Sequence, residues 1–182
     1  MLAVPFKERG AMTDEYLDAM RELWTSATPS FAGKYTQFGD VVFEPKPVQK
    51  PHPPIWIGGH TKAALRRTVR IGAAWHPINR PPEELRAGVA EIARLCREGK
   101  RADVPALTLR NDVKILRAGE SAPASTHAGR VLAGEPAALV EQIRELAGCG
   151  VQHLVLEFLA ADGRELDAQM TLFAERVGPH LA

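Results

Sequence analysis

The chain has 182 residues, of which 45% are hydrophobic, so it is long enough to form one domain with a real core. Its 23 basic and 22 acidic side chains leave a formal net charge of +1, which gives no electrostatic footprint for nucleic acid or an anionic membrane. No stretch approaches the roughly 20 apolar residues of a membrane span, and the N-terminal residues lack the length of a secretory signal. We therefore expect a cytoplasmic protein whose partner is a small molecule or another protein.

The first 54 residues predict a helix followed by extended chain. A leading helix is expected within residues 1–32, because apolar side chains recur on one helical face at Tyr16, Leu17, Met20, Leu23 and Trp24. Residues 34–43 are predicted to form a hairpin, and five prolines between positions 45 and 54 then hold the chain extended. Because this connector over 33–54 is rich in aromatic and β-branched residues, we interpret it as ordered and treat 1–182 as a single domain.

From residue 55 onward, predicted strands alternate with predicted helices. The strands are expected at 55–57, 73–76, 107–115 and 151–159, and each is followed by a helix with one apolar face. Four such βα units over 55–182 predict a parallel sheet with right-handed crossovers, which is an α/β fold. A complete (β/α)8 barrel needs eight strands and typically about 250 residues, so the chain fits either an open sheet or half of a barrel.

One turn is a candidate phosphate site. The run from Pro54 to Thr61, Pro-Ile-Trp-Ile-Gly-Gly-His-Thr, is typical of a strand, a glycine turn and the start of a helix. Two glycines let backbone N–H groups face a ligand, and the positive end of a helix dipole favours an anion. His60 could donate to a phosphate oxygen, or it could be an ordinary exposed residue at a helix start. A glycine turn is also a common way of simply entering a helix.

Aromatic residues near this turn allow two interpretations. Trp75 and His76 end the next predicted strand, where the indole could either wall a cofactor ring or pack in the core. Trp56 is predicted to be a core residue. Cys96 and Cys149 lie far apart without the spacing of a metal or redox motif, so both are expected to be reduced core residues.

Polar side chains on the last two predicted strands form a second candidate group: Arg110, Asp112, Lys114, His153 and Glu157. They would share a surface facing a barrel lumen if both strands point them inward. The group fits an acid–base pair, and it equally fits structural ion pairs across barrel strands. Glu157 lies deep in an apolar run, so its charge would need a partner. No spacing of His, Cys or carboxylate residues supports a metal site.

Several motifs, taken in order and spacing across nearly the whole chain, resemble those of the bacterial-luciferase-like oxidoreductases, and most closely their deazaflavin-dependent branch. They are Phe6 to Tyr16 (FKERGAMTDEY), Leu23 to Thr25 (LWT), Phe31 to Tyr35 (FAGKY), Phe43 to Gln49 (FEPKPVQ), Pro51 to Gly59 (PHPPIWIGG) and Trp75 to Pro77 (WHP). The resemblance implies a (β/α)8 barrel that binds FMN or coenzyme F-420, whose ring exchanges hydride with a substrate. It begins only at the helix after the fourth barrel strand, so it implies the C-terminal half of such a barrel.

The resemblance also implies which residues contact the cofactor. It places the cofactor phosphate on the turn after the first strand of this half, and the candidate cofactor-binding residues are Ile57, Gly58, Gly59, His60, Thr61 and Trp75. Where the family usually has Gly-Asp-Gly-Trp, this chain has Gly72-Ala-Ala-Trp75, so Ala73 replaces an acidic residue. No catalytic residue and no metal ligand is assigned.

Two functions from different classes follow. The first is a luciferase-like oxidoreductase or monooxygenase that is active only when its barrel is completed by another chain or by a second copy. Because a half barrel leaves two strand edges and one sheet face uncovered, we expect a homodimer burying more than the ~1,600 Å² of a standard interface. The second is a non-catalytic, truncated remnant that binds a flavin or serves as a structural dimer.

Overall fold

The computed structural model of the chain describes residues 5–117, 119–124 and 129–181. The chain divides into two compact units, Met1–Pro54 and Ile55–Ala182, and we describe each by itself. The division falls where the predicted connector ends and the first predicted strand begins. Within the described ranges, no helix is both long enough and apolar enough to cross a lipid bilayer.

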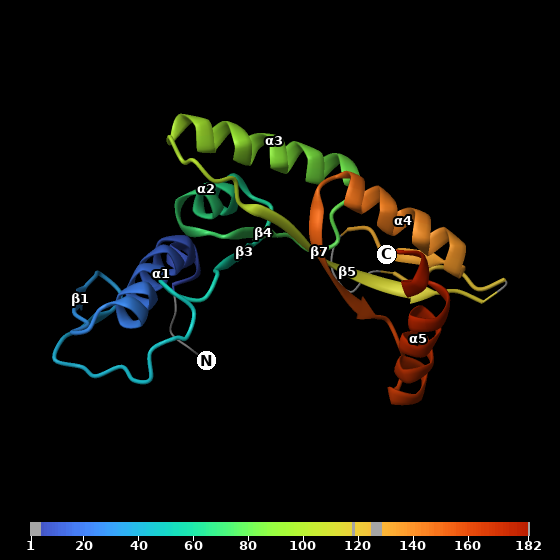
Figure 1. Cartoon of the computed structure of the whole chain (residues 1–182), viewed down its shortest axis with the longest axis horizontal. Coiled ribbons are helices and arrows are strands. Elements are labelled where there is room, and N and C mark those ends of the chain that lie inside the picture. The colour runs from blue at the N-terminus through green and yellow to red at the C-terminus, as the bar shows by residue number, and fades with distance from the viewer. Residues whose placement is uncertain (1–4, 118, 125–128, 182) are drawn as a thin grey trace. The chain divides into compact units, whose positions relative to one another are not determined.

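The first unit contains the predicted leading helix, α1, which spans Arg9–Thr25 after a short 3-10 turn at Phe6–Glu8. A two-residue antiparallel ladder follows, between β1 (Phe31–Ala32) and β2 (Gln37–Phe38) (Figure 1).

The hairpin predicted over 34–43 therefore lies several residues earlier, with its turn at 33–36. The reason is a contact distant in sequence: the Glu15 carboxylate accepts backbone N–H bonds from Lys34, Tyr35 and Thr36 at 2.8, 2.7 and 2.8 Å. These charge-assisted bonds fix the turn at that place.

The second unit is a parallel sheet with helices. Its principal strands are β3 (Trp56–Gly58), β4 (Ala74–His76), β5 (Ala106–Ile115) and β7 (Val151–Phe158), in the order β3-β4-β5-β7. The helices are α2 (Lys62–Ile71), α3 (Pro82–Glu98), α4 (Pro136–Gly148) and α5 (Gly163–Arg176), followed by a 3-10 turn at Gly178–His180. The four predicted βα units are thus present.

One strand was not predicted. β6 (Leu132–Gly134) is only three residues long and pairs in parallel with the carboxyl end of β5, from Val113 to Ile115. It lies between β5 and α4, and three residues are too few to show a periodicity.

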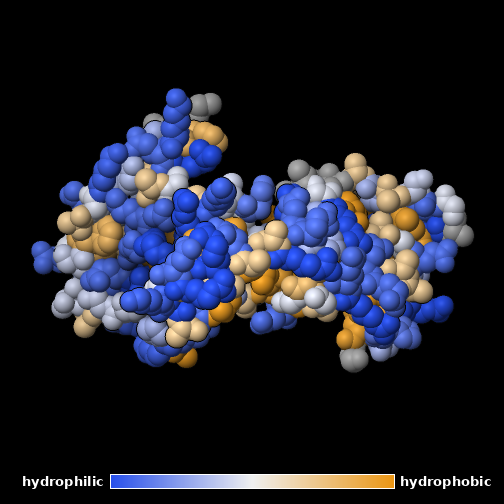
Figure 2. All heavy atoms as spheres, turned by 90° about the horizontal axis from the view of Figure 1, so that it is seen from above, coloured by the Kyte–Doolittle hydropathy of each residue, from blue (hydrophilic) through white to orange (hydrophobic). Residues whose placement is uncertain are grey.

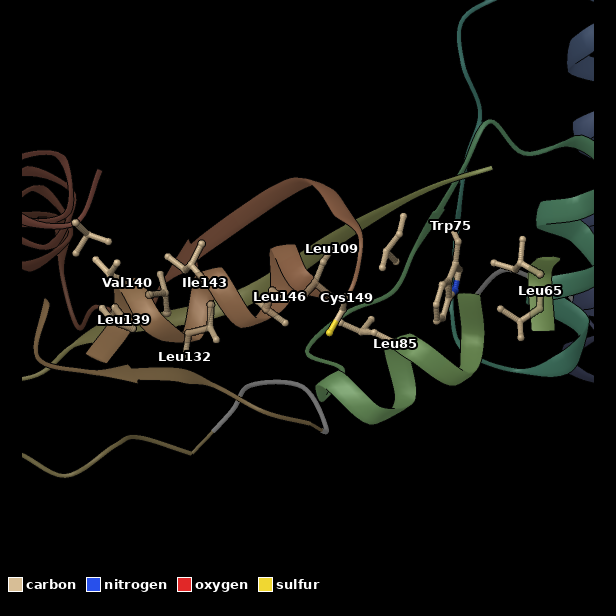
Figure 3. Packing of buried hydrophobic residues seen from close by; sticks show 14 of the residues in the cluster. Leu65, Trp75, Leu85, Leu109, Leu132, Leu139, Val140, Ile143, Leu146 and Cys149 are labelled. Atoms are coloured by element: carbon tan, nitrogen blue, oxygen red, sulfur yellow. The ribbon is translucent and has the colours of Figure 1, made fainter. Parts of the chain in front are cut away.

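The apolar core lies between the sheet and its helices. α3 and α4 lie on the same side of the sheet (Figure 1), and the core forms a long row from Leu65 and Trp75 at one end to Leu139 and Val140 at the other (Figure 3). Full burial of each leucine in this row contributes roughly 1.5–3 kcal/mol. The two cysteines are free and belong to this cluster, as expected. The outward surface over α3 is mostly hydrophilic (Figure 2).

The other face of the sheet, which we call the open face, carries Trp56, His76, Arg110, His153 and Glu157. Side chains alternate along each strand, so these residues point away from the side that α3 and α4 cover. Two apolar side chains on this face remain solvent-exposed, Trp56 at 42% and Val155 at 37%. The fold is the α/β arrangement predicted from the sequence: parallel βα units forming half of a (β/α)8-type barrel.

Asn79 joins three segments of the second unit. It is fully buried in a left-handed conformation, with a φ of 52°. Its N–H donates to the Arg110 carbonyl at 2.9 Å, its carbonyl accepts from the Arg130 N–H at 2.8 Å, and its Oδ1 accepts from the Asp112 N–H at 2.8 Å. One residue, through its backbone and its side chain, therefore ties the chain after β4 to the middle of β5 and to the approach to β6.

We expect Asn79→Ala to lower the free energy of unfolding by about 1–3 kcal/mol, because the buried Asp112 N–H loses its acceptor. Lys100→Ala is the matched control, since Lys100 is exposed and has nearly the same φ, 53°. Urea denaturation measures both variants. Equal losses would show that the backbone conformation, and not the Oδ1 bond, accounts for the effect.

Candidate functional site

The predicted glycine turn joins β3 to α2 at the carboxyl end of β3. Gly59 has a φ of +92°, a conformation that side chains disfavour. Thr61 is the N-cap of α2, and its Oγ1 accepts from the Ala64 N–H at 3.2 Å. The first N–H groups of a helix have no acceptor within the helix, so this turn presents main-chain donors at the positive end of α2.

The predicted cofactor residues around this turn lie in different environments. Gly58, Gly59, His60 and Thr61 are exposed, whereas Ile57 is buried in the core on the helix side of the sheet. The Ile57 side chain therefore packs in the core. The exposed residues 58–61 are the ones that a ligand could contact.

A cavity of about 480 Å³ borders the turn, between α2 and α3; its lining comprises His60, Lys62, Leu65, Trp75, Arg80, Glu84, Ala87, Gly88, Glu91 and Arg94. Its charges are mixed. Arg80 pairs with Glu84 at 3.1 Å and Arg94 with Glu91 at 2.7 Å. The hydrogen bond from Arg94 lowers the pKa of the Glu91 carboxyl, and the charge of Lys62 lowers it further. The cavity thus combines an apolar floor with fixed charges of both signs.

Trp75 lies in the core beside the turn. It is only 2% exposed, its side chain lies among the core residues near α3 (Figure 3), and its Nε1 donates to the Gly59 carbonyl at 2.7 Å. A Cβ added at Gly88 would lie 2.1 Å from the indole ring, so α3 approaches the ring closely because residue 88 is glycine. Of the two interpretations given for Trp75, core packing describes its place in this structure.

Trp56 is not the core residue that the sequence suggested. Alternation places it on the open face, where its ring centroid is 5.3 Å from that of His76 and 5.3 Å from that of His153. The Thr108 hydroxyl donates to the Trp75 carbonyl at 3.2 Å, so it accepts from Nδ1 of His76 at 2.8 Å. Neutral His76 then keeps its Nε2 lone pair for another donor.

The polar group predicted on β5 and β7 is brought together only in part. Arg110 forms an ion pair with Glu157 and lies 3.9 Å from the Asp112 carboxylate. Lys114 lies apart from them and pairs with Glu165 of α5. The Glu157 charge has its partner in Arg110. These contacts favour the interpretation as structural ion pairs over that of an acid–base pair.

Among the residues that the structure describes, no three His, Cys, Asp or Glu side chains gather as they would around a metal ion.

The pKa of His76 is lowered, first by partial burial and then by the positive charges of His153 and Arg110. Below the unfolded-state pKa of about 6.5, the unfolded chain binds a proton that folded His76 resists. The contribution of His76 to stability therefore falls as the pH decreases from about 6.5 through its lower folded pKa.

We expect His76→Gln to make this decline shallower. The free energy of unfolding from urea denaturation between about pH 7.5 and 5 measures it. His60→Gln, at an exposed position of the same unit, is the matched control. If the pH profile of His76→Gln has the same slope as that of the unsubstituted chain, His76 does not contribute to it.

Comparisons with known proteins agree with this architecture. The family model described as luciferase-like monooxygenase matches residues 1–113, more than half of the chain. An FMNH2-dependent dimethylsulfone monooxygenase of Pseudomonas putida is 33% identical over 85 residues, 47% of this chain and 23% of that protein. An uncharacterized protein of Mycobacterium tuberculosis is 46% identical over 73 residues, 40% of this chain and 26% of that protein. The matches thus span about a quarter of these curated relatives.

Solved structures show the same fold over nearly the whole chain. An F-420-dependent secondary alcohol dehydrogenase, in complex with an F-420–acetone adduct, superposes with a TM-score of 0.77 at 16% identity, over 98% of this chain and 64% of that one. The monooxygenase RslO1 from Streptomyces bottropensis superposes with a TM-score of 0.80 at 22% identity, over 98% of this chain and 64% of that one. The predicted resemblance is confirmed: the chain belongs to the luciferase-like monooxygenase family.

Proposed function

We propose that this chain is part of a luciferase-like oxidoreductase in which FMN or coenzyme F-420 exchanges hydride with a small-molecule substrate. The dimethylsulfone monooxygenase is FMNH2-dependent by name, and the alcohol dehydrogenase is F-420-dependent. The observation that carries the proposal is the glycine turn from Gly58 to Thr61 at the N-terminus of α2. Both cofactors carry a phosphate that such a turn suits.

The residues of the turn fit a phosphate. Main-chain N–H groups after Gly59, the positive end of the α2 dipole, and the side chains of His60 and Lys62 form a donor set for an anion. The Thr61 hydroxyl oxygen accepts from the Ala64 N–H in the helix cap and keeps its O–H as a further donor for an anion. When bound, the cofactor ring supplies the hydride chemistry. The chain's own residues bind and orient the cofactor.

We expect Gly59→Asp to weaken FMN and coenzyme F-420 binding by about tenfold or more, because the substitution adds a negative charge and strains a left-handed position. Gly150→Asp is the matched control, because Gly150 has a φ of +90° and lies at the end of α4, with nothing within 4 Å of an added Cβ. Fluorescence titration measures the dissociation constants. Equal binding by the two variants would contradict a phosphate site at the turn.

The open face requires a cover. Among the described strands, β3 and β7 end the row of principal strands and each offers an unpaired edge, and Trp56 and Val155 stand exposed on the open face; both features favour association. We infer that a second copy of the chain covers it, because two copies bring eight principal strands, the number that closes a (β/α)8 barrel. The interface is expected to exceed ~1,600 Å².

We expect the purified chain to be a dimer and Val155→Asp, on the open face, to weaken it, because the substitution replaces exposed apolar surface with a carboxylate that must lose its water in the interface. Val104→Asp is the matched control; Val104 is 56% exposed and lies in the turn before β5, away from the open face. Light scattering gives the molar masses.

A monomeric chain would contradict closure by a second copy. If that monomer bound cofactor only when mixed with the N-terminal part of a luciferase-like barrel, the missing strands would come from a separate half.

A second candidate function is a non-catalytic remnant that binds a flavin or serves as a structural dimer. The observation that favours it is Ala73, which stands where the resemblance leads us to expect an acidic residue, so any role of that carboxylate is lost. Saturable cofactor binding by a dimer without hydride exchange would support this function over the first.

A further inference from the structure

We propose that Trp75 is the positioning residue of the phosphate turn: its indole N–H fixes the orientation of the Gly59–His60 peptide and thereby aims the His60 N–H at the phosphate. This inference rests on the proposed function. It assigns to Trp75 a role other than stacking on the cofactor ring, because the indole is buried and the turn carbonyl occupies its N–H.

The orientation follows from peptide planarity. In a trans peptide, the carbonyl oxygen of one residue and the N–H of the next point in opposite directions. The Gly59 carbonyl points at the indole Nε1, 2.7 Å away, so the His60 N–H points away from the indole. A single hydrogen bond therefore determines the direction of the first main-chain donor after Gly59.

The indole also selects against the flipped peptide. A tryptophan side chain is a donor only, so it cannot accept a hydrogen bond from an N–H that turns toward it. A flip of the Gly59–His60 peptide would place the His60 N–H against the indole N–H, where the existing hydrogen bond is partly buried. Such an unsatisfied pair of donors is costly, which holds the turn in one of its two orientations.

The indole is itself held in place. Trp75 pairs with Ile57 on β3 and with Leu107 on β5, so its backbone is anchored on both sides. Its ring lies against Gly88 of α3, where even one added methyl group would overlap it. The donor is therefore rigid, and it acts from β4 on a turn that follows β3.

The test replaces only the N–H. β-(3-Benzothienyl)alanine has the shape of tryptophan with sulfur in place of the N–H group, and it is incorporated at position 75. The same replacement at Trp56, on the open face, is the matched control. The readout is the ratio of the dissociation constants of riboflavin and FMN, because only FMN carries a phosphate and a general loss of packing would weaken both ligands alike.

We expect the preference for FMN over riboflavin to fall about tenfold in the position-75 variant and to persist in the position-56 variant. Without any ligand, the amide hydrogen of His60 is also expected to change its NMR chemical shift and exchange rate in the position-75 variant alone. Gly88→Ala, which displaces the indole from the α3 side, is expected to lower the same preference.

The outcomes separate the two proposals. If the unsubstituted chain prefers FMN and the position-75 variant keeps that preference, with an unchanged His60 amide signal, the role of Trp75 is refuted and the phosphate turn stands. If the unsubstituted chain binds riboflavin as tightly as FMN, or binds neither FMN nor coenzyme F-420, the phosphate turn is refuted, and the role of Trp75 with it.

Discussion

The second unit depends on β5, which pairs with other strands along both of its edges and carries apolar residues on one face and charged residues on the other. This strand bonds β4 and β6 along one edge and β7 along the other, so every principal strand except β3 is held through it directly. Leu109 and Val113 on one of its faces pack under the helices, while Arg110 and Asp112 on the other face carry charge. Because this one strand borders an apolar core on one face and the Arg110–Asp112 pair on the other, it sets which residues meet on each face of the sheet.

Local sequence patterns were enough to predict the alternation of strands and helices from residue 55, the glycine turn and the family. The alternation and the turn depend on residues close together in the chain, and the family on short motifs that follow one another in order along it. Two features that were missed depend on contacts distant in sequence: the Glu15 carboxylate fixes the turn at 33–36, and the Trp75 indole donates to the Gly59 carbonyl. A third, β6, was missed because it has only three residues. The prediction for Trp56 was wrong. Alternation along a strand shows that Trp56 and its sequence neighbours lie on opposite faces of the sheet, but it does not show which face the helices cover.

The two faces of the sheet should tolerate different amino-acid substitutions during evolution. The helix side is closely packed, with Gly88 admitting the indole and leucines filling the row beyond it. The open face instead carries ring contacts and ion pairs, such as Trp56 with His153 and Arg110 with Glu157. Such groups adapt to a new covering surface by changing rotamer, whereas a packed core tolerates little change in volume.

The capped start of α2 has a further consequence. The Thr61 hydroxyl oxygen accepts from the Ala64 N–H in the helix cap, and a phosphate at the turn would also meet main-chain N–H groups that have no acceptor within the helix. Peptide groups are the same whatever the side chain, so substitutions at positions 60 and 62 leave the main-chain N–H donors of the turn in place. Substitution is restricted at the residues that set the backbone of the turn: Gly59 has a positive φ, and Trp75 on the neighbouring strand donates to its carbonyl.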